Sequence, residues 1–330
     1  MAEVLYLETG SQDPHYNLAF EEFVLLNRTQ GDILMLWQNA NSIIIGQNQN
    51  TEAEINRTFV EQHGIQVVRR TTGGGAVYHD LGNLNYSFIT DVETYDEKTR
   101  QQFAGPIVRA LEGLGLSAEA SGRNDILVNG CKVSGTAQRV QKGRILHHGT
   151  LLFEANMDMV SGALRVDQAK LQSKGVQSVR SRVGNIRSFL EKDMTLPEFW
   201  AYLKVALQQD GLRPDTLSEA ELAQVRQLQK EKYDTWEWNF GRSLPYSYRS
   251  RKRFPGGTLE VQLELNHGRI SDIRFYGDFL SRRPLTQLQE QLTGLAFERR
   301  SVSAVLGAFP LGEFFGTITK DEILEVLFEA

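Results

Sequence analysis

The sequence predicts an α+β protein, with a mixed or antiparallel sheet flanked by helices and a small α+β domain at the C-terminal end. Three observations lead to this prediction. Strand-like runs joined by short turns recur between residues 33 and 153, and amphipathic helical stretches lie beside and after them. A second hairpin pattern, with its own helical stretches, follows residue 257. Strands grouped in this way are typical of an antiparallel or mixed sheet with helices packed on it.

The first elements are read from hydrophobic periodicity. Tyr16–Leu26 has apolar residues at helical spacing, and Ile33–Trp37 and Ser42–Ile45 are apolar runs separated by a polar turn. Glu97–Leu114 has helical spacing, and we expect Pro106 to mark a break in it. Further strands are expected at Val67–Arg70, Ala76–His79 and Leu84–Ile89.

A hairpin is predicted around Asn129-Gly130, which separates two apolar stretches. Lys132 then lies early on the return strand. Strict alternation would place Lys132 and Ser134 on one face of that strand, with Cys131 and Val133 on the other. The next strand-like run spans Arg144–Phe153.

The second half is mainly helical at first, over Pro197–Gln208 and Ser218–Lys230. Ser243–Arg253 then interrupts the pattern with a proline and dense basic residues, so we place a domain boundary there, between residues 1–245 and 246–330. We interpret this basic segment as a solvated linker; nucleic acid or an acidic protein domain are the alternatives. Beyond it we expect strands Thr258–Leu265 and Arg269–Tyr276, and helices Leu285–Leu295 and Ile318–Phe328.

Composition is that of an ordinary globular protein. The chain has 330 residues, 41% hydrophobic and 23% charged, with a formal net charge of −5. This charge gives no reason to expect nucleic acid as a partner, and no apolar stretch reaches the ~20 residues that span a bilayer. The single cysteine excludes an internal disulfide and fits a reducing compartment. The N-terminal residues lack the pattern of an export signal, so we expect a cytoplasmic location.

The most informative segment is Arg69–Asp80, which joins two arginines to three consecutive glycines. Backbone amides without neighbouring Cβ atoms can approach a ligand closely and form an anion-binding concavity. Arg70, and to a lesser extent Arg69, can add charge-assisted hydrogen bonds to a phosphate. The order of residues matches neither the Walker A loop nor the dinucleotide fingerprint. A glycine-rich hairpin with surface arginines is the alternative interpretation.

Other candidate residues are weaker. His79, His147 and His148 do not have the spacing of a known zinc motif, so we do not expect a structural zinc. Cys131 is interpreted as a buried structural thiol, with an acyl-carrying nucleophile as the alternative. Lys132, flanked by small and apolar residues, is a candidate for a cleft-facing cation; an exposed strand lysine is the commoner case.

These segments together resemble the lipoate-protein ligases of the bacterial type. The resemblance runs along nearly the whole chain. It is carried by blocks in the same order: Asn17–Glu22, Arg69–Asp80, Gly122–Asp125, Lys132–Gly135, His147–Leu152, Lys174–Val183 and Thr235–Gly241. It implies the fold shared with biotin ligases and related to class II aminoacyl-tRNA synthetases, followed by a C-terminal accessory domain.

The resemblance also implies a two-step reaction in which lipoate and ATP give lipoyl-AMP, and a lysine of an acceptor lipoyl domain then takes the lipoyl group. Acceptors would be E2 subunits of 2-oxoacid dehydrogenases and the glycine cleavage H protein. Lys132 would be the catalytic residue, stabilising charge in both steps. The ATP and adenylate site would comprise Arg70, Gly75, Ala76, Val77, Tyr78, Asn83, Asp125 and Lys132.

Lipoate would contact Arg70, Gly74, Lys132, His148 and Gly149. Lys174, Gly175, Arg180 and Arg182 would belong to a loop that covers the adenylate. Mg²⁺ would bind through the ATP phosphates, with Asp125 as a possible protein ligand. We expect a monomer.

Three other functions remain open at this stage. A lipoyl or octanoyl transferase of the same fold would need no ATP, and the glycine-arginine block and the C-terminal domain argue against it. A biotin ligase would have a different glycine-arginine motif. A non-catalytic protein that only binds lipoyl domains or lipoate is the least favoured, because the surroundings of Arg70 and Lys132 are intact.

Overall fold

The chain forms two compact units in the computed structural model, which describes residues 4–92, 97–122, 124–165, 183–207, 211–240, 248–266 and 268–328. Unit 1 comprises Met1–Ile44, Asn56–Val68 and Val77–Thr235. Unit 2 comprises Ile45–Ile55, Arg69–Ala76 and Trp236–Ala330. Arg69–Ala76 of the glycine-rich block therefore belong to the same unit as the C-terminal residues, whereas the rest of the block belongs to unit 1.

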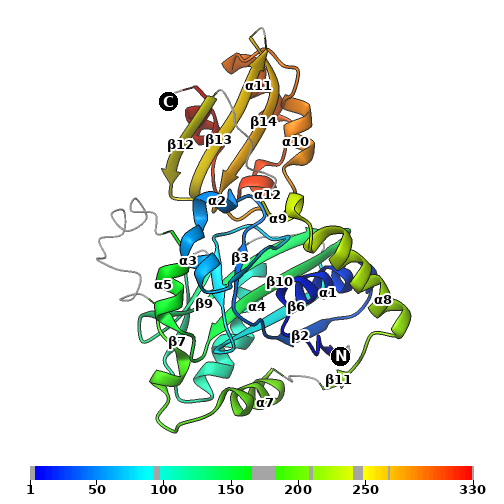
Figure 1. Ribbon diagram of the computed structural model, residues 1–330, viewed down its shortest axis with the longest axis vertical. Coiled ribbons are helices and arrows are strands. Elements are labelled where there is room, and N and C mark those ends of the chain that lie inside the picture. Colours follow the sequence, from blue (N-terminus) through cyan, green and yellow to red (C-terminus); the bar gives the residue numbers. More distant parts are fainter. Residues whose placement is uncertain are drawn as a thin grey trace. The chain divides into compact units, whose positions relative to one another are not determined.

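The centre of unit 1 is a mixed sheet of eight strands in the order β11-β1-β2-β6-β10-β9-β8-β7 (Figure 1). β1 pairs in parallel with β11 and with β2, and the pairs from β2 to β7 are antiparallel. The predicted mixed sheet flanked by helices is thus confirmed. The strands are β1 (Val4–Glu8), β2 (Ile33–Trp37), β6 (Asn83–Asp91), β7 (Ala118–Ser121), β8 (Asp125–Val128), β9 (Cys131–Gln141), β10 (Arg144–Leu152) and β11 (Leu212–Pro214).

Helices cover both faces of this sheet. α1 (Pro14–Asn27) is buried along most of its length, and its N-terminus is capped by the Asp13 side chain, which accepts a hydrogen bond from the His15 amide. On the opposite face lie α4 (Glu97–Glu112), which has an amphipathic sequence, and α7 (Leu196–Ala206), which has a capped N-terminus. The helices and turns of unit 1 are α1, α3 (Arg57–Gln62), α4, α5 (Met157–Ala163), η1 (Ile186–Phe189), α7, α8 (Glu219–Leu228) and the π-helix η2 (Gln229–Tyr233).

The strand register divides side chains between the two faces. In β6, Leu84 and Tyr86 lie on the face that packs against α4 and α7, and Asn83, Asn85 and Ser87 therefore lie on the α1 face. Cross-strand partners share a face in an antiparallel pair. Tyr86 is opposite Gly149, Asn85 is opposite Thr150, and Ser87 is opposite His148. The β6–β10 pair thus has one apolar face and one polar face.

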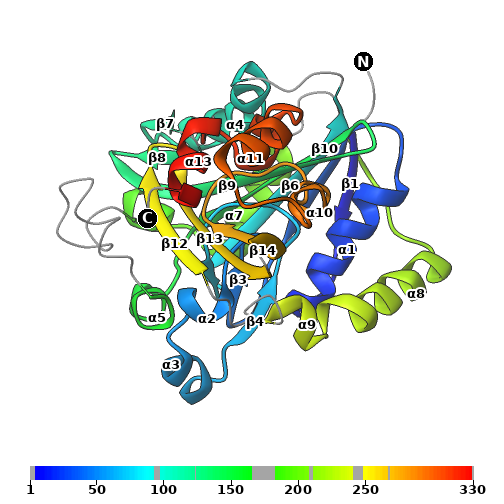
Figure 2. The same ribbon diagram turned by 90° about the horizontal axis from the view of Figure 1, so that it is seen from above.

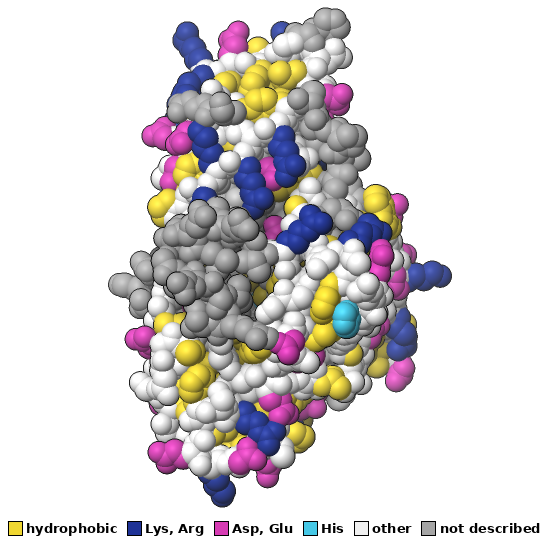
Figure 3. All heavy atoms as spheres, turned by 60° about the vertical axis from the view of Figure 1, so that its left-hand side comes forward, with side chains coloured by type: hydrophobic (Ala, Val, Ile, Leu, Met, Phe, Trp, Pro, Cys, Tyr) yellow, Lys and Arg dark blue, Asp and Glu magenta, His cyan; other side chains and the backbone are white. Residues whose placement is uncertain are grey.

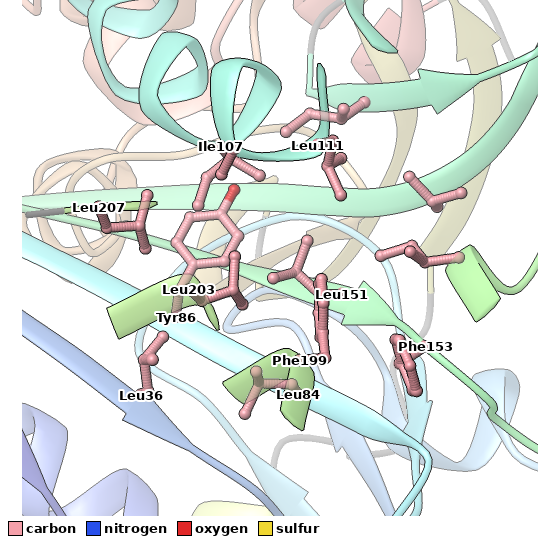
Figure 4. Close-up of a cluster of buried hydrophobic side chains, with 14 of the residues drawn as sticks. Leu36, Leu84, Tyr86, Ile107, Leu111, Leu151, Phe153, Phe199, Leu203 and Leu207 are labelled. Carbon is pink, nitrogen blue, oxygen red and sulfur yellow. The ribbon is translucent and has the colours of Figure 1, made fainter. Parts of the chain in front are cut away.

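The apolar face forms the core of unit 1. Tyr86, Leu84 and Leu151 from the sheet pack against Ile107 and Leu111 of α4, and Phe199 and Leu203 of α7 cover the same cluster (Figure 4). Phe153 and Phe199 stack with ring centroids 4.7 Å apart. Burial of this many large side chains is the main source of stability for such a layer. α4 continues through Pro106, so the predicted break there was wrong.

The α1 face holds a buried group of charges around Glu22. Its carboxylate accepts hydrogen bonds from Arg139 Nη1 of β9 at 2.9 Å and from Tyr233 Oη at 2.8 Å. Lys232 Nζ lies 2.7 and 2.9 Å from the two carboxylate oxygens. Burial by itself raises the pKa of Glu22, but Lys232 and Arg139 outweigh it and leave the pKa below its ordinary value. Glu22 is therefore ionised, and it fastens η2 to α1.

The N-terminal end of α1 makes further contacts with η2. His15 Nδ1 donates to the Tyr233 carbonyl at 2.7 Å, and Gln229 Nε2 donates to Asp13 at 2.9 Å. α8 lies beside α1 in both views (Figures 1 and 2). The last residues of unit 1 are thus fixed on α1.

A second small sheet has the order β4-β3-β5, with β3 (Ser42–Ile45), β4 (Gln66–Arg69) and β5 (Val77–His79). β3 and β5 are antiparallel, with Ile43 opposite Tyr78. The predicted strands here agree with the structure to within one residue at each end.

Unit 2 contains the antiparallel sheet β12-β13-β14, formed by β12 (Tyr248–Phe254), β13 (Gly257–Asn266) and β14 (Arg269–Gly277). One face of this sheet packs on helices around Leu263, Phe275 and Phe315. The helices of unit 2 are α2 (Thr51–Glu54), α9 (Trp236–Asn239), α10 (Thr286–Leu292), α11 (Arg299–Gly307), α12 (Leu311–Phe315) and α13 (Lys320–Phe328). The predicted hairpin and the final helix are confirmed.

The basic segment after residue 247 is a strand, so its interpretation as a linker was wrong for β12; residues 243–247 lie outside the described part. Basic side chains are prominent on the β12–β14 part of the chain in Figure 3. Several have acidic partners: Arg249 pairs with Glu260, Arg253 with Asp278, and Lys252 with Glu325. Because these charges are compensated within the unit, the segment gives no independent support for a nucleic-acid partner.

Arg69 is fully buried in unit 2. Its side chain donates to the carbonyls of Gly46, Gln47 and Gln49 at 2.7–3.1 Å, to Thr51 Oγ1 at 2.7 Å and to the Trp238 carbonyl at 2.9 Å. Its backbone amide also donates to Asn239 Oδ1 at 2.9 Å. Arg69 therefore joins residues 46–51 to α9, and its guanidinium serves this structure.

Within the described residues, no helix is both long enough and apolar enough to cross a membrane.

We predict that Lys232→Met destabilises unit 1 measurably, because it removes one of the cations from the buried Glu22 carboxylate. Arg139 and Tyr233 remain, so we expect a cost of about 1–3 kcal/mol, below the range for a fully unpaired buried charge. The cost should be largest above pH 5. It should shrink as the pH falls toward the lowered pKa of Glu22, because protonation removes the charge that Lys232 compensates.

Thermal unfolding followed by circular dichroism at pH 7 and at pH 4 measures this difference. Lys204→Met is the matched control, because Lys204 forms an ion pair with Glu8 in which both side chains are 43% exposed. Such a pair contributes at most about 1 kcal/mol. Equal effects of the two substitutions at pH 7 would contradict a structural role for the Glu22 group.

Candidate active site

The glycine-rich loop of unit 2 is shaped by Arg70. Arg70 is 6% exposed and donates from Nε to Thr72 Oγ1 at 2.9 Å. Its Nη2 donates to the Gly73 carbonyl at 2.5 Å and the Gly75 carbonyl at 2.9 Å. The guanidinium thus draws two carbonyl groups of the loop to one side. The predicted role of Arg70 toward phosphate is untested, but its side chain lies at the centre of the predicted anion-binding loop.

The glycines of this loop are required by close packing. Gly74 has a φ of +89°, and a Cβ on Gly73 would lie 2.6 Å from the Ser281 amide nitrogen. Gly75 and Ala76 are partly exposed. Among the residues that the structure describes, neither backbone amide has a hydrogen-bond partner. Two amide donors without a protein partner, in partly exposed residues beside a buried arginine, are suited to an anion.

Lys132 occupies a defined position in unit 1. Its Nζ lies 2.6 Å from Asp125 Oδ1 of the neighbouring strand, and both side chains are about one-third exposed. A Cβ added to Gly135 would lie 3.1 Å from Lys132 Nζ, so the ammonium group lies over this glycine. Lys132 is thereby held on the surface of the sheet, with part of its charge still accessible.

A β-bulge places Lys132 there. Ser134 pairs with Ile126, but the next residue of β8, Leu127, pairs with Lys132, so Val133 is the extra residue. Neighbouring residues of β8 point to opposite faces, and their partners Ser134 and Lys132 therefore do so too. The prediction that Lys132 and Ser134 share a face was wrong, because it assumed an uninterrupted strand. Lys132 shares its face with Gly135, the partner of Asp125.

A row of polar residues crosses the α1 face beside Lys132. Gly135 N donates to Thr150 Oγ1 at 3.2 Å, Thr150 is opposite Asn85, and Asn85 is opposite Trp37 of β2. Asn83 Nδ2 donates to Asn85 Oδ1 at 3.0 Å. The sequence analysis placed Asn83, but not Asn85, among the site residues.

The next row of the same face contains a buried hydrogen-bonded network around Glu21. Trp37 Nε1 donates to Ser87 Oγ at 2.9 Å, and Ser87 Oγ donates to Glu21 Oε1 at 2.6 Å. His148 Nδ1 donates to the same carboxylate at 2.9 Å. His148 thus lies on the α1 face as part of a fixed network. The sequence analysis named Glu21 only as part of the segment Asn17–Glu22. The signal that could have identified it is a pair of adjacent acidic residues in a largely apolar helix.

Gly149 and His147 lie on the opposite face of β10. A Cβ on Gly149 would lie 2.5 Å from Tyr86 Oη, so close packing accounts for this glycine. His147 stacks on Phe103 with centroids 5.0 Å apart, and burial lowers its pKa to about 3. His147 is therefore a neutral core residue. Gly149 is next to His148 in sequence but does not share its face, and its predicted contact with lipoate is untested.

Tyr78 is buried in β5 and donates from Oη to Asn41 Oδ1 at 2.9 Å. Burial, aided by Asp80, raises its pKa to about 12, so the phenol is neutral. Val77 and Ala76 precede it and are partly exposed. Arg70, Gly74, Gly75 and Ala76 belong to unit 2, and the other described site residues belong to unit 1. Lys174, Gly175, Arg180 and Arg182 lie outside the described residues.

Cys131 is half-buried, whereas the sequence analysis expected a buried thiol. It pairs with Val128 and Lys132 with Leu127, so their side chains point to opposite faces, as predicted. In the part of the chain that the structure describes, no three His, Cys, Asp or Glu side chains gather as a metal site.

Comparison with known proteins identifies the family. Residues 13–208 match the model of the lipoyl protein ligase A/B catalytic domain, and residues 243–327 match that of the bacterial lipoate protein ligase C-terminus. The chain is 43% identical over 321 residues to the lipoate-protein ligase LplJ of Bacillus subtilis, covering 96% of this chain and 97% of that protein.

Two solved structures are similar in fold. One is Plasmodium falciparum LipL1 in complex with lipoate, with a TM-score of 0.83 and 25% identity, covering 99% of this chain and 100% of that one. The other is a lipoate-protein ligase A bound with ATP, with a TM-score of 0.64 and 30% identity, covering 73% of this chain and 98% of that one. The chain therefore belongs to the family of lipoate-protein ligases.

Proposed function

We propose that this chain activates free lipoate with ATP and transfers the lipoyl group to a lysine of an acceptor lipoyl domain. In the first step a carboxylate oxygen of lipoate attacks the α-phosphorus, and pyrophosphate leaves. In the second step the acceptor amine attacks the acyl carbon, and AMP leaves. The observation that best supports the proposal is Lys132, held over Gly135 with part of its charge accessible. The related structures that contain lipoate and ATP support it further.

Lys132 is proposed to stabilise negative charge in both steps. Its ammonium group lies 2.6 Å from the Asp125 carboxylate. A protonated lysine can neutralise the α-phosphate and the acyl oxygen but cannot act as a base. Catalysis would then consist mainly of positioning and electrostatic stabilisation. No nucleophilic side chain is needed, and Cys131, on the opposite face of β9, need not carry the acyl group.

The residues proposed to contact ATP or the adenylate are Arg70, Gly75, Ala76, Val77, Tyr78, Asn83 and Asp125. Support comes from the loop geometry: Arg70 holds two carbonyls to one side, while the amides of Gly75 and Ala76 are accessible. Gly74, His148 and Gly149 are proposed to contact lipoate together with Arg70 and Lys132. Lys174, Gly175, Arg180 and Arg182 are proposed, on resemblance alone, to cover the adenylate.

Mg²⁺ is proposed to arrive with ATP. The described residues that could receive it fit only weakly, because Asp125 is already paired with Lys132 and no cluster of acids surrounds it. Mg²⁺ commonly uses substrate phosphates and water for most of its ligands. Its contribution when bound would be to neutralise the departing pyrophosphate.

The acceptors are proposed to be lipoyl domains of E2 subunits and the H protein. We also propose residues 1–245 as the catalytic domain and 246–330 as the accessory domain, which is compatible with the ranges of the two family matches. The single cysteine supports a reducing compartment such as the cytoplasm.

The direct test is pyrophosphate release from ATP by purified protein, with lipoate, octanoate or biotin added in turn, followed by mass spectrometry of a lipoyl-domain acceptor. We expect lipoate-dependent release and a lipoylated acceptor. Acyl transfer from an octanoylated protein donor without pyrophosphate release would instead identify the alternative, a transferase of the same fold.

We predict that Lys132→Ala lowers lipoate-dependent pyrophosphate release by about 100-fold or more, because it removes the cation next to the reacting atoms. The melting temperature should change little, since the side chain is about one-third exposed. Lys132→Arg keeps the charge but changes its position. Its rate of pyrophosphate release should lie between those of the unaltered enzyme and Lys132→Ala. Near-normal adenylation by Lys132→Ala would refute the assigned role.

We also predict that Gly135→Ala slows adenylation by about 10-fold, a loss that depends only on displacing Lys132. The new methyl group would lie 3.1 Å from Nζ and 3.2 Å from Cε, so the ammonium group must shift. Because small displacements of a catalytic group are costly, the rate should fall more than the affinity for ATP. Gly312→Ala is the control, since a Cβ there meets nothing within 4 Å. An unchanged rate in Gly135→Ala would show that this position of Lys132 is not required.

A further inference from the structure

Asn83 and Asn85 form a buried amide pair with two unsatisfied atoms. Their exposed fractions are 0% and 2%, and Asn83 Nδ2 donates to Asn85 Oδ1 at 3.0 Å. Among the described residues, Asn83 Oδ1 and Asn85 Nδ2 have no hydrogen-bond partner, and both are buried. A buried donor without an acceptor costs about 1–3 kcal/mol. Such a cost in a substrate site is expected where a ligand later supplies the partner.

The location of Asn85 relates this donor to Lys132. Asn85 is opposite Thr150 in the β6–β10 pair, and Thr150 Oγ1 accepts a hydrogen bond from the Gly135 amide on the next strand. Lys132 Nζ lies over Gly135. Asn85 and Lys132 therefore flank Thr150 on one face of the sheet. Adjacent strands are about 4.8 Å apart, so the backbones of Asn85 and Gly135 are about 10 Å apart and their donors can converge on one group between them.

The surrounding contacts orient this amide. Asn85 Oδ1 is occupied by Asn83 Nδ2, so its Nδ2 is the group left for another partner. Asn83 thus acts as a positioning residue for Asn85. Trp37, the partner of Asn85 on the other side, already donates its Nε1 to Ser87. The neighbouring indole donor therefore does not compete for the same acceptor.

We propose that Asn85 is a catalytic residue whose Nδ2 donates a hydrogen bond to the acyl oxygen of the substrate, together with Lys132. This inference rests on the proposed function and goes beyond it. In transfer, the neutral amine of the acceptor lysine bonds to the acyl carbon, and the carbonyl electron pair moves onto the acyl oxygen. The pair on the acyl oxygen then re-forms the carbonyl while the bond from carbon to the phosphate oxygen breaks, AMP leaves with the electron pair of that broken bond, and the positively charged nitrogen of the new amide releases a proton to water. Asn85 stabilises the oxygen while it is negatively charged.

Two donors at that oxygen are chemically useful because Lys132 is shared with Asp125. The acyl oxygen gains most of its charge only when the tetrahedral intermediate forms. A fixed neutral amide donor is then more valuable than in the ground state, since no reorganisation is required. The loss of such a donor should therefore lower the rate of transfer more than substrate affinity.

The test compares Asn85→Leu and Asn85→Asp with the unaltered enzyme. Transfer is measured from purified lipoyl-AMP to a lipoyl domain, and adenylation is measured separately by pyrophosphate release. We expect both variants to transfer about 100-fold more slowly at neutral pH, with the KM for ATP within about twofold. Tyr86→Phe is the control: it removes a buried hydroxyl from the opposite face of the same strand, and transfer should be unchanged.

The pH profile separates catalysis from structure. A protonated carboxyl group can donate a hydrogen bond, so Asn85→Asp should regain transfer as the pH falls, whereas Asn85→Leu should not. Asn85→Asp retains the shape of asparagine and tests the proposal even if the leucine variant is too unstable to assay. The proposal is overturned if both variants transfer at the normal rate, if the loss is confined to the KM for ATP, or if the two pH profiles are parallel. An unaltered enzyme that fails to adenylate lipoate would instead count against the proposed function.

Discussion

Two adjacent buried carboxylates, Glu21 and Glu22 of α1, constrain how unit 1 is organised. Neither can be buried without partners, since an isolated charge in a protein interior is very costly. Glu21 is compensated by Ser87 and His148, whereas Glu22 is compensated by Arg139, Lys232 and Tyr233. Because consecutive helical residues point in different directions, the two acids engage different rows of the sheet. One row belongs to the candidate site, and the other secures the last residues of unit 1.

The position of Lys132 depends on a departure from regular strand geometry. An uninterrupted β9 would direct Lys132 to the same face as Ser134, which is fully buried on the side of Tyr86 and the core. The extra residue Val133 reverses that parity, so the cation lies on the polar face over Gly135. β-bulges often redirect a side chain next to an active site. One inserted residue thus decides whether this lysine is available for chemistry.

The sequence predicted most elements because their periodicity is local, as in β2 and β3, whose bounds it gave correctly. It favoured Arg70 over Arg69 for the anion site but gave no physical reason for this choice, since the two are adjacent and chemically alike. Burial among the carbonyls of residues 46–49 makes Arg69 structural, and those contacts are long-range. The bulge in β9 was also missed because it depends on the pairing with β8, although a glycine within the strand, Gly135, could have indicated it. β12 was missed because its many basic residues conceal an alternation that only pairing with β13 makes clear.

The cations of both candidate binding regions already have partners within the protein. Arg70 donates to carbonyls of its own loop, and Lys132 is paired with Asp125. Binding an anion is then an exchange of partners, so the net gain is smaller than the direct attraction. By contrast, the buried side-chain amide of Asn85 gains a partner without losing one, and the amides of Gly75 and Ala76 exchange only water for the anion. Neutral, fixed donors therefore contribute more to recognition than their charge suggests, while Lys132 contributes most where new negative charge develops.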